Sequence, residues 1–120
     1  MNEKTRVLIV DDSVGIRQTM SMILTRKGFD VACAADGSEA LKMVKERPFD
    51  KVLLDIRLPG IDGVDVNKNI QSMQPHPRVA MITAYADESK VRAALEAGAE
   101  KVFYKPLDLE AVISYIQQGA

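Results

Sequence analysis

The sequence is poor in cysteine, in long apolar segments and in excess charge of either sign. Its one cysteine, Cys33, can form neither an internal disulfide nor a multi-cysteine metal site. It has no long apolar run and no signal peptide, which predicts a cytoplasmic protein with no membrane partner. Sixteen basic residues against seventeen acidic ones give a net charge of −1, which argues against direct binding of nucleic acid.

The chain also lacks any long stretch of proline, glycine or serine that could act as a linker. Its 120 residues are a common length for one domain, and 47% hydrophobic residues are enough to fill one core. Residues 1–120 are therefore expected to form a single domain.

Short apolar runs alternate five times with segments of helical periodicity. The runs are 6–12, 30–35, 51–55, 78–83 and 101–104. After the first run, a helical face of Ile16, Met20, Ile23 and Leu24 has Asp12 or Ser13 as its cap and Gly28 as its stop, and further helices are expected over 37–45, 64–74, 88–97 and 108–118. Uninterrupted apolar runs are typical of strands buried on both faces of a parallel sheet. The alternation predicts an α/β protein of the flavodoxin-like (βα)5 class, with helices on both faces of a sheet in the order 2-1-3-4-5.

Three carboxylates mark the ends of two predicted strands. Asp11 and Asp12 end the first run, and Asp55 ends the third. These strands are neighbours in the predicted order, so the acids should meet at one crevice, flanked by Thr83 and Lys105. Crowded like charges repel each other unless a cation compensates them, and carboxylate oxygens favour Mg²⁺, Mn²⁺ or Ca²⁺. The sequence therefore predicts a divalent-cation pocket.

Four motifs taken together resemble the response regulator receiver domain, the phosphoacceptor module of two-component signalling. They are Asp11-Asp12, the segment LDIRLPGIDG at 54–63, Thr83-Ala84 and Lys105-Pro106. The resemblance covers essentially the whole chain and includes the single-domain regulators of chemotaxis and sporulation. It implies one receiver domain over residues 1–120.

The resemblance also implies the chemistry of the acids. Asp55 would be the phosphoacceptor, since a carboxylate can attack phosphorus and form an acyl phosphate. Asp12 and Asp55 would hold Mg²⁺ together with the backbone carbonyl of Arg57, while Asp11 would act mainly through a coordinated water. Lys105 and Thr83 would offer an ammonium and a hydroxyl to the transferred group.

A phosphorylation-dependent switch is the implied function. The phosphoryl group would come from a sensor histidine kinase or a phosphotransfer protein. Its charge would draw Thr83 and Lys105 inward and change the surface of the fourth helix, fifth strand and fifth helix. A downstream effector or output domain would read that surface, with a phosphorylation-linked homodimer as a further partner. Both a stand-alone receiver and part of a longer regulator fit the sequence.

Two positions near the site bear on the switch. The family usually has Tyr, Phe or His three residues before the lysine, but Val102 stands there in this chain. Phe103 points to the opposite face of the strand, so coupling is expected to run through Thr83 and its loop alone. Tyr85 is expected to shield the acyl phosphate from water.

Other interpretations stay open for single residues. Asp12 alone could be a helix cap, Lys105 a solvated lysine and Thr83 an ordinary strand residue. The Lys105-Pro106 bond is a candidate for the cis form, although trans is the default for X-Pro bonds.

Two other functions also fit part of the pattern. A metal-dependent phosphatase with an aspartyl nucleophile usually has a second Asp two residues on, where this chain has Arg57. A docking pseudo-receiver usually lacks one of the acids or the lysine, but this chain has all three acids and Lys105. We therefore expect self-catalysed phosphorylation and dephosphorylation, and no enzyme that turns over an external substrate.

Overall fold

The computed structural model describes residues 4–84 and 87–118, and these contain one five-stranded parallel sheet in the order β2-β1-β3-β4-β5. The strands are β1 (Arg6–Val10), β2 (Asp30–Ala34), β3 (Lys51–Asp55), β4 (Arg78–Thr83) and β5 (Lys101–Tyr104). The helices are α1 (Val14–Arg26), α2 (Gly37–Glu46), α3 (Gly63–Gln71), α4 (Glu88–Glu96) and α5 (Leu109–Gln117). The predicted flavodoxin-like fold and strand order are confirmed.

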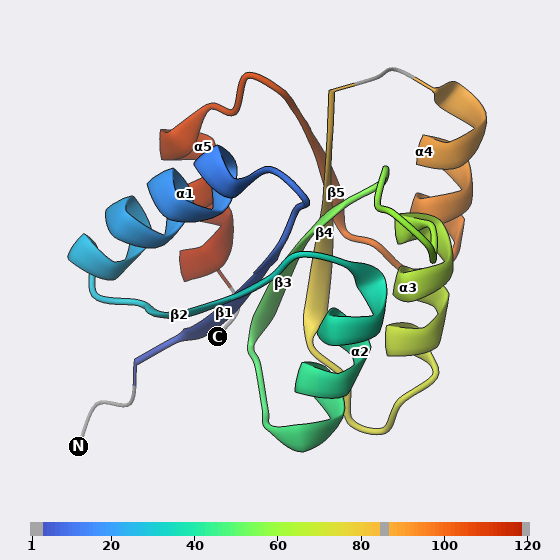
Figure 1. The fold of residues 1–120 in the computed structure, drawn as a ribbon, viewed down its shortest axis with the longest axis horizontal. Coiled ribbons are helices and arrows are strands. Elements are labelled where there is room, and N and C mark those ends of the chain that lie inside the picture. Colours follow the sequence, from blue (N-terminus) through green and yellow to red (C-terminus); the bar gives the residue numbers. More distant parts are fainter. Residues whose placement is uncertain (1–3, 85–86, 119–120) are drawn as a thin grey trace.

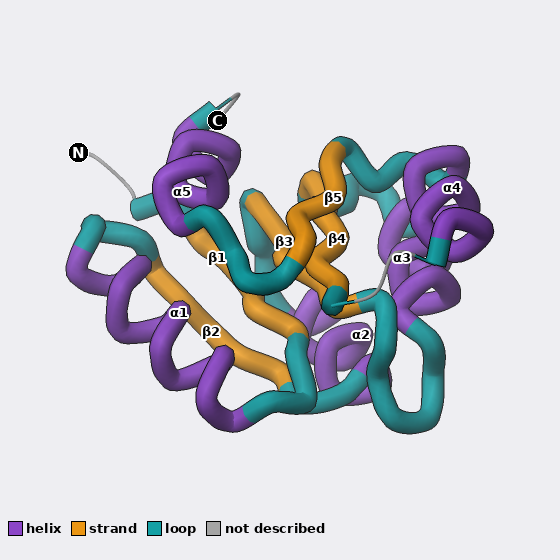
Figure 2. Tube along the Cα trace, turned by 90° about the horizontal axis from the view of Figure 1, so that it is seen from above, coloured by secondary structure: helices purple, strands orange, loops and turns teal. Residues whose placement is uncertain are grey.

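The helices form two layers around the sheet. Figures 1 and 2 show α1 and α5 on one face and α2, α3 and α4 on the other. Neighbouring residues of β1 point to opposite layers: Val7 and Ile9 pack with α1 and α5, whereas Leu8 and Val10 pack with α2 and α3. The central strand β3 is buried along its whole length, as its uninterrupted apolar run predicts.

Each helix begins just beyond the carboxyl end of a strand, and a side chain caps its first turn. The capping residues are Ser13, Asp36, Asp62, Asp87 and Asp108. The Ser13 hydroxyl accepts a hydrogen bond from the Ile16 N–H at 3.3 Å. Ser13, and not Asp12, is therefore the cap of α1, which leaves the Asp12 carboxylate available at the sheet edge.

One predicted helix is shorter than expected. The sequence predicts a helix over 64–74, but α3 ends at Gln71 and a turn follows. The Ser72 hydroxyl donates to the Asn69 carbonyl at 2.7 Å, which satisfies a helix-end acceptor. Pro75 follows Gln74 through a cis peptide bond, and a residue before proline is disfavoured in the helical conformation. No helix in the described residues has the length and apolar character needed to cross a membrane.

Candidate functional site

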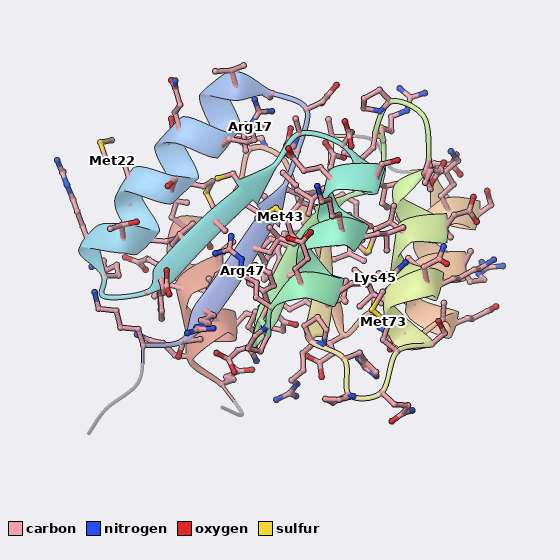
Figure 3. All side chains as sticks on the ribbon, turned by 60° about the horizontal axis from the view of Figure 1, so that its bottom comes forward. Arg17, Met22, Met43, Lys45, Arg47 and Met73 are labelled. Carbon is pink, nitrogen blue, oxygen red and sulfur yellow. The ribbon has the colours of Figure 1, made fainter. Side chains whose placement is uncertain are left out.

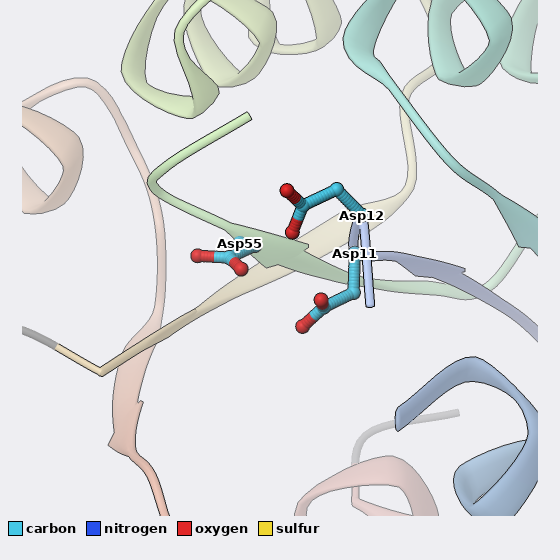
Figure 4. A group of neighbouring side chains, drawn as sticks. All are labelled: Asp11, Asp12 and Asp55. Atoms are coloured by element: carbon cyan, nitrogen blue, oxygen red, sulfur yellow. The ribbon is translucent and has the colours of Figure 1, made fainter. Parts of the chain in front are cut away.

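Three carboxylates meet at the carboxyl end of the sheet. Asp11 follows β1 directly, Asp12 comes next, and Asp55 is the last residue of the adjacent strand β3. One oxygen from each residue lies within 4.8 Å of one oxygen of both others (Figure 4). Asp11 and Asp55 are buried, whereas Asp12 is exposed and lies on the solvent side of the cluster. The structure thus brings together the three acids that the sequence predicts to meet.

Lys105 lies directly against this cluster. Its Nζ is 2.8 Å from Asp11 Oδ2 and 3.0 Å from Asp55 Oδ2, and only 18% of its side chain is exposed. The backbone N–H of Lys105 donates to the Thr83 carbonyl at 2.8 Å, which fixes the end of β5 beside the end of β4. The Lys105-Pro106 bond is cis, so the default trans expectation is wrong and the cis candidate is confirmed. Lys105 is therefore a site residue in position and not a solvated surface lysine.

The electrostatics of Asp55 reflect its crowded position. Burial raises the pKa of the Asp55 carboxyl, and the negative charge of Asp11 raises it further. Hydrogen bonds from the Lys105 ammonium and from the Arg57 N–H, the latter at 3.0 Å, lower the pKa but do not cancel the rise. For Lys105, burial lowers the pKa, but the contacts with Asp11 and Asp55 outweigh it and the pKa is raised. A charged ammonium thus partly compensates two crowded carboxylates.

Thr83 and Val102 occupy the positions expected of them. Thr83 is buried at the end of β4 and is paired in register with Tyr104 of β5. Val102 packs with the layer of α2, α3 and α4, whereas Phe103 is buried on the opposite face against Tyr115. The predicted opposition of Val102 and Phe103 is confirmed. Tyr85, expected to shield the acyl phosphate, lies outside the described residues.

The loop after Asp55 is closed tightly against the strand end. The Gly63 N–H donates to the Ile56 carbonyl at 2.8 Å. A Cβ at Gly63 would lie 2.1 Å from the Asp55 carbonyl oxygen, so only glycine allows this approach. Asp62 caps α3 and also forms an ion pair with Lys90 of α4 that the sequence does not indicate. This pair connects the loop after Asp55 to α4.

Arg17 is a neighbour of the site that the sequence analysis misses. Its Nη1 donates to the Asp11 carbonyl oxygen at 2.7 Å. Hydrophobic periodicity identifies Ile16 and Met20 as part of the apolar face of α1, but it gives no information about Arg17, a polar residue next to that face. The one sequence clue is that Arg17 follows the acid pair by only five residues, in the first turn of the helix.

The donor set fits a hard divalent cation. All three clustered side chains offer carboxylate oxygens, the ligands that Mg²⁺ and Ca²⁺ prefer. The buried Oδ2 of Asp11 accepts no hydrogen bond of good geometry within the described residues, although the Lys105 ammonium lies 2.8 Å away. A buried oxygen with acceptor capacity to spare, among crowded negative charges, is favourable for cation binding.

Comparison with known proteins agrees with this geometry. A family model of the response regulator receiver domain matches residues 7–117. The chain is 40% identical over 113 residues to sporulation initiation phosphotransferase F of Bacillus subtilis, which covers 93% of this chain and 89% of that protein. It is 34% identical over 114 residues to the DNA-binding response regulator MtrA of Mycobacterium tuberculosis. That match covers 95% of this chain but only 50% of MtrA.

Solved structures resemble the whole fold. A CheY-like receiver domain protein of Methanospirillum hungatei has a TM-score of 0.92 at 29% identity and covers 97% of this chain and 93% of its own. Thermotoga maritima TrrA in complex with Mg²⁺-BeF has a TM-score of 0.85 at 28% identity, with coverages of 95% and 97%. A Burkholderia pseudomallei response regulator with a phosphorylated aspartic acid and a calcium ion has a TM-score of 0.87 at 26% identity, with coverages of 96% and 68%. The chain belongs to the response regulator receiver domain family of two-component signalling.

Proposed function

We propose that this receiver domain takes a phosphoryl group onto Asp55 in a Mg²⁺-dependent reaction and uses the new charge as a signal. The observation that carries the proposal is the placement of Asp55 among Asp11, Asp12 and Lys105, with oxygens of the acids within 4.8 Å of one another. The Burkholderia relative with a phosphorylated aspartic acid and the Thermotoga relative with Mg²⁺-BeF support the same chemistry.

The reaction begins with an Asp55 oxygen in line with the phosphorus of the donor. A bond forms between this oxygen and phosphorus, the bond from phosphorus to the donor breaks, and the electron pair leaves with the donor. Asp12, Asp55 and the Arg57 carbonyl would hold Mg²⁺, with Asp11 acting through a water. When bound, the cation neutralises charge on the phosphoryl oxygens.

Lys105 and Thr83 stabilise the transferred group. Lys105 Nζ lies 3.0 Å from the Asp55 oxygen, so a small movement brings it onto a phosphoryl oxygen. Thr83 is buried at the end of the neighbouring strand and supplies its hydroxyl as a second donor. Lys105 is already in contact with Asp55 before the reaction, and donors positioned in advance lower the free energy of a charge-dispersed transition state. The protein thus contributes catalytic groups to its own modification.

The phosphodonor is proposed to dock beside the site. A groove of about 450 Å³ runs between α1 and the segment after β5, with Lys105 at its edge. Its apolar side chains include Ile16, Met20, Leu107 and Leu109. A histidine kinase or phosphotransfer protein that buries this groove would bring its phosphohistidine to Asp55. The naming of the Bacillus relative as a phosphotransferase is consistent with transfer between proteins.

The output is proposed to be the surface of α4, β5 and α5. Leu95 and Tyr104 are large hydrophobic residues exposed there, beside a groove of about 300 Å³ that an effector, an output domain or a second receiver could cover. Because Val102 replaces the usual rotating aromatic, the signal would reach α4 through Thr83. The ion pair between Asp62 and Lys90 gives the loop after Asp55 a second connection to α4.

A mass-spectrometric experiment tests the proposal. The protein is incubated with acetyl phosphate with and without Mg²⁺, and its intact mass is recorded. One phosphate should appear only with Mg²⁺, and Asp55→Asn should abolish it. Asp65→Asn, which removes an exposed acid of α3 outside the cluster, should leave the adduct unchanged. An adduct of normal yield on Asp55→Asn would remove Asp55 from its role.

The same experiment separates two other functions. A phosphatase would release inorganic phosphate continuously, with more than one turnover per protein and no stable adduct. A docking pseudo-receiver would show neither adduct nor release. The absence of a second Asp at position 57 argues against the phosphatase, and the presence of all the acids and Lys105 argues against the pseudo-receiver.

A further inference from the structure

We propose that Arg17 is a positioning residue for the metal site, because it holds the peptide that joins Asp11 to Asp12. The inference rests on the proposed function, since it names a residue that sets how tightly the acids bind Mg²⁺. Within the part of the chain that the structure describes, the Arg17 side chain contacts the backbone carbonyl of Asp11 and not the carboxylates. Its effect on Mg²⁺ would therefore be indirect.

The contact of Arg17 is part of a closed turn between β1 and α1. The guanidinium Nη1 of Arg17 donates to the Asp11 carbonyl at 2.7 Å, and the Arg17 N–H donates to the Ser13 carbonyl at 3.1 Å. The Ser13 N–H in turn donates to Asp11 Oδ1 at 2.9 Å. Cys33 of β2 lies beside the same turn, with its Sγ 3.8 Å from the Arg17 carbonyl. Figure 3 shows Arg17 on the part of α1 nearest to this end of the sheet.

The carbonyl that Arg17 binds belongs to the peptide plane between the two acids. Because a peptide bond is planar, a hydrogen bond to the Asp11 oxygen also fixes the direction in which Asp12 leaves the plane. Rotation of this peptide would turn the Asp12 carboxylate away from the other two. A charged donor in a partly buried position makes a stronger hydrogen bond than a neutral one, so it restrains this rotation well.

Asp12 depends on this restraint more than the other acids do. The carboxylate of Asp11 is held by the Ser13 N–H and Lys105, and that of Asp55 by the Arg57 N–H and Lys105. Among the residues that the structure describes, no comparable contact to the Asp12 carboxylate is recorded, and Asp12 is exposed. The backbone therefore places the Asp12 carboxylate, and Arg17 stabilises that backbone.

Charge and positioning predict opposite effects when Arg17 is replaced. The guanidinium is a positive charge near a cation pocket, so its removal alone would tighten Mg²⁺ binding through weaker repulsion. Loss of the hydrogen bond would misplace Asp12 and weaken Mg²⁺ binding, as the loss of supporting contacts does at other metal sites. The sign of the change in affinity thus distinguishes the two roles.

The test measures the Mg²⁺ dissociation constant of the full chain by titration calorimetry. Arg17→Met should bind Mg²⁺ about tenfold more weakly than the wild type. The control Arg26→Met removes the same kind of charge from the exposed last turn of α1 and should leave the constant unchanged. With acetyl phosphate, the Mg²⁺ concentration for half-maximal phosphorylation should rise by the same factor in Arg17→Met. The rate at saturating Mg²⁺ should stay near that of the wild type, which a general loss of structure would not allow.

Unchanged or tighter Mg²⁺ binding by Arg17→Met would overturn the inference. If Arg17→Met does not fold, Arg17→Gln, whose side chain is shorter, is measured instead. Weaker Mg²⁺ binding would again support the inference, and unchanged or tighter binding would overturn it. Failure of the proposed function is a separate result, because the wild type itself would then show no Mg²⁺-dependent adduct. If the wild type is phosphorylated normally and Arg17→Met binds Mg²⁺ with equal affinity, the proposed role of Arg17 is wrong and the proposed function of the domain stands.

Discussion

The two ends of the central sheet each hold a lysine in contact with other polar groups, but the surroundings of the two lysines differ. At the carboxyl end, Lys105 lies between Asp11 and Asp55, with Asp12 close by. At the amino end, Lys51 is buried at the start of β3 and donates to the Gln118 carbonyl at 2.7 Å. One lysine faces an excess of negative charge, whereas the other faces a neutral acceptor at the end of α5.

The amino end is a network of hydrogen bonds and ion pairs around Glu100 and Lys51. Lys51 Nζ also lies 4.7 Å from the ring centre of Tyr115, and the Tyr115 hydroxyl donates to Glu100 at 2.9 Å. Arg78 pairs with the same carboxylate at 2.8 Å. Burial lowers the pKa of Lys51, and the neighbouring charge of Arg78 lowers it further. Burial raises the pKa of Glu100, but hydrogen bonds from Arg78 and Tyr115 outweigh this and the pKa is lowered.

The difference shows which end is organised for stability and which for chemistry. At the amino end, Glu100 is paired with Arg78 and Tyr115 and Lys51 with the Gln118 carbonyl, so the network joins β3, β4 and α5. At the carboxyl end, three carboxylates share the charge of Lys105, and the pKa of Asp55 is raised as a result of burial and of Asp11. Functional sites often retain such unfavourable arrangements because the ligand or the reaction needs them.

The largest effect is expected from a change that breaks the geometry of the carboxyl end. In Gly63→Ala, the new Cβ would lie 2.1 Å from the backbone oxygen of Asp55, so the loop or the strand end has to move. We expect the free energy of unfolding to fall by about 3 kcal/mol and the yield of the phosphate adduct to fall with it. Urea denaturation and intact mass measure the two effects.

Gly15→Ala is the matched control for this substitution. Gly15 lies in α1, and its nearest heavy-atom contact with an added Cβ would be the Ser13 hydroxyl at 3.8 Å. Alanine favours a helix over glycine by about 1 kcal/mol, so this variant should be slightly more stable than the wild type. Equal stability of the two alanine variants would contradict a tight approach at Gly63.

The next effect concerns the amino end alone. Lys51→Ala removes the hydrogen bond to Gln118 and leaves a cavity beside Tyr115, so the free energy of unfolding should fall by about 2 kcal/mol. The phosphate adduct should form as in the wild type, because Lys51 is at the opposite end of β3 from Asp55. Lys42→Ala, on the exposed side of α2, should change neither quantity. Loss of the adduct in Lys51→Ala would show that the two ends are not independent.

The smallest change in stability is expected at the carboxyl end and depends on pH. Asp55→Asn removes one of the crowded charges, so in Mg²⁺-free buffer at pH 7 it should raise the free energy of unfolding by about 1 kcal/mol while abolishing the adduct. Because the folded-state pKa of Asp55 is raised, its carboxyl favours the folded state below its unfolded pKa of about 4. That contribution is lost as the pH rises through the raised pKa.

The advantage of Asp55→Asn should therefore shrink as the pH is lowered from 7 toward 4. Urea titrations of both proteins at several pH values measure it. A constant difference across this range would contradict a raised pKa for Asp55, and a less stable variant at pH 7 would show that the Lys105 contact outweighs the crowding.

Most of the fold follows from short-range patterns in the sequence. The bounds of β3, β4 and β5 agree with the predicted runs, and Gly28 and Gly98, which follow α1 and α4, have the positive φ expected after a helix. The convergence of Asp11, Asp12 and Asp55 was also predictable, because parallel strands that are neighbours place their carboxyl ends together. The end of α3 was predicted less well, since the hydrogen bond from the Ser72 hydroxyl to the Asn69 carbonyl ends the helix before Gln74.

Periodicity and turn residues in the sequence set the helices and strands and place Asp11, Asp12 and Asp55 at strand ends, because these are local patterns. The meeting of these acids follows once the flavodoxin-like strand order is adopted. Three contacts arise from the packing of the elements alone: Lys105 bridges Asp11 and Asp55, Lys51 is buried against the end of α5, and Arg17 holds the Asp11 carbonyl. Such contacts depend on the distance and direction between elements after packing, and no periodic pattern of residue types encodes them.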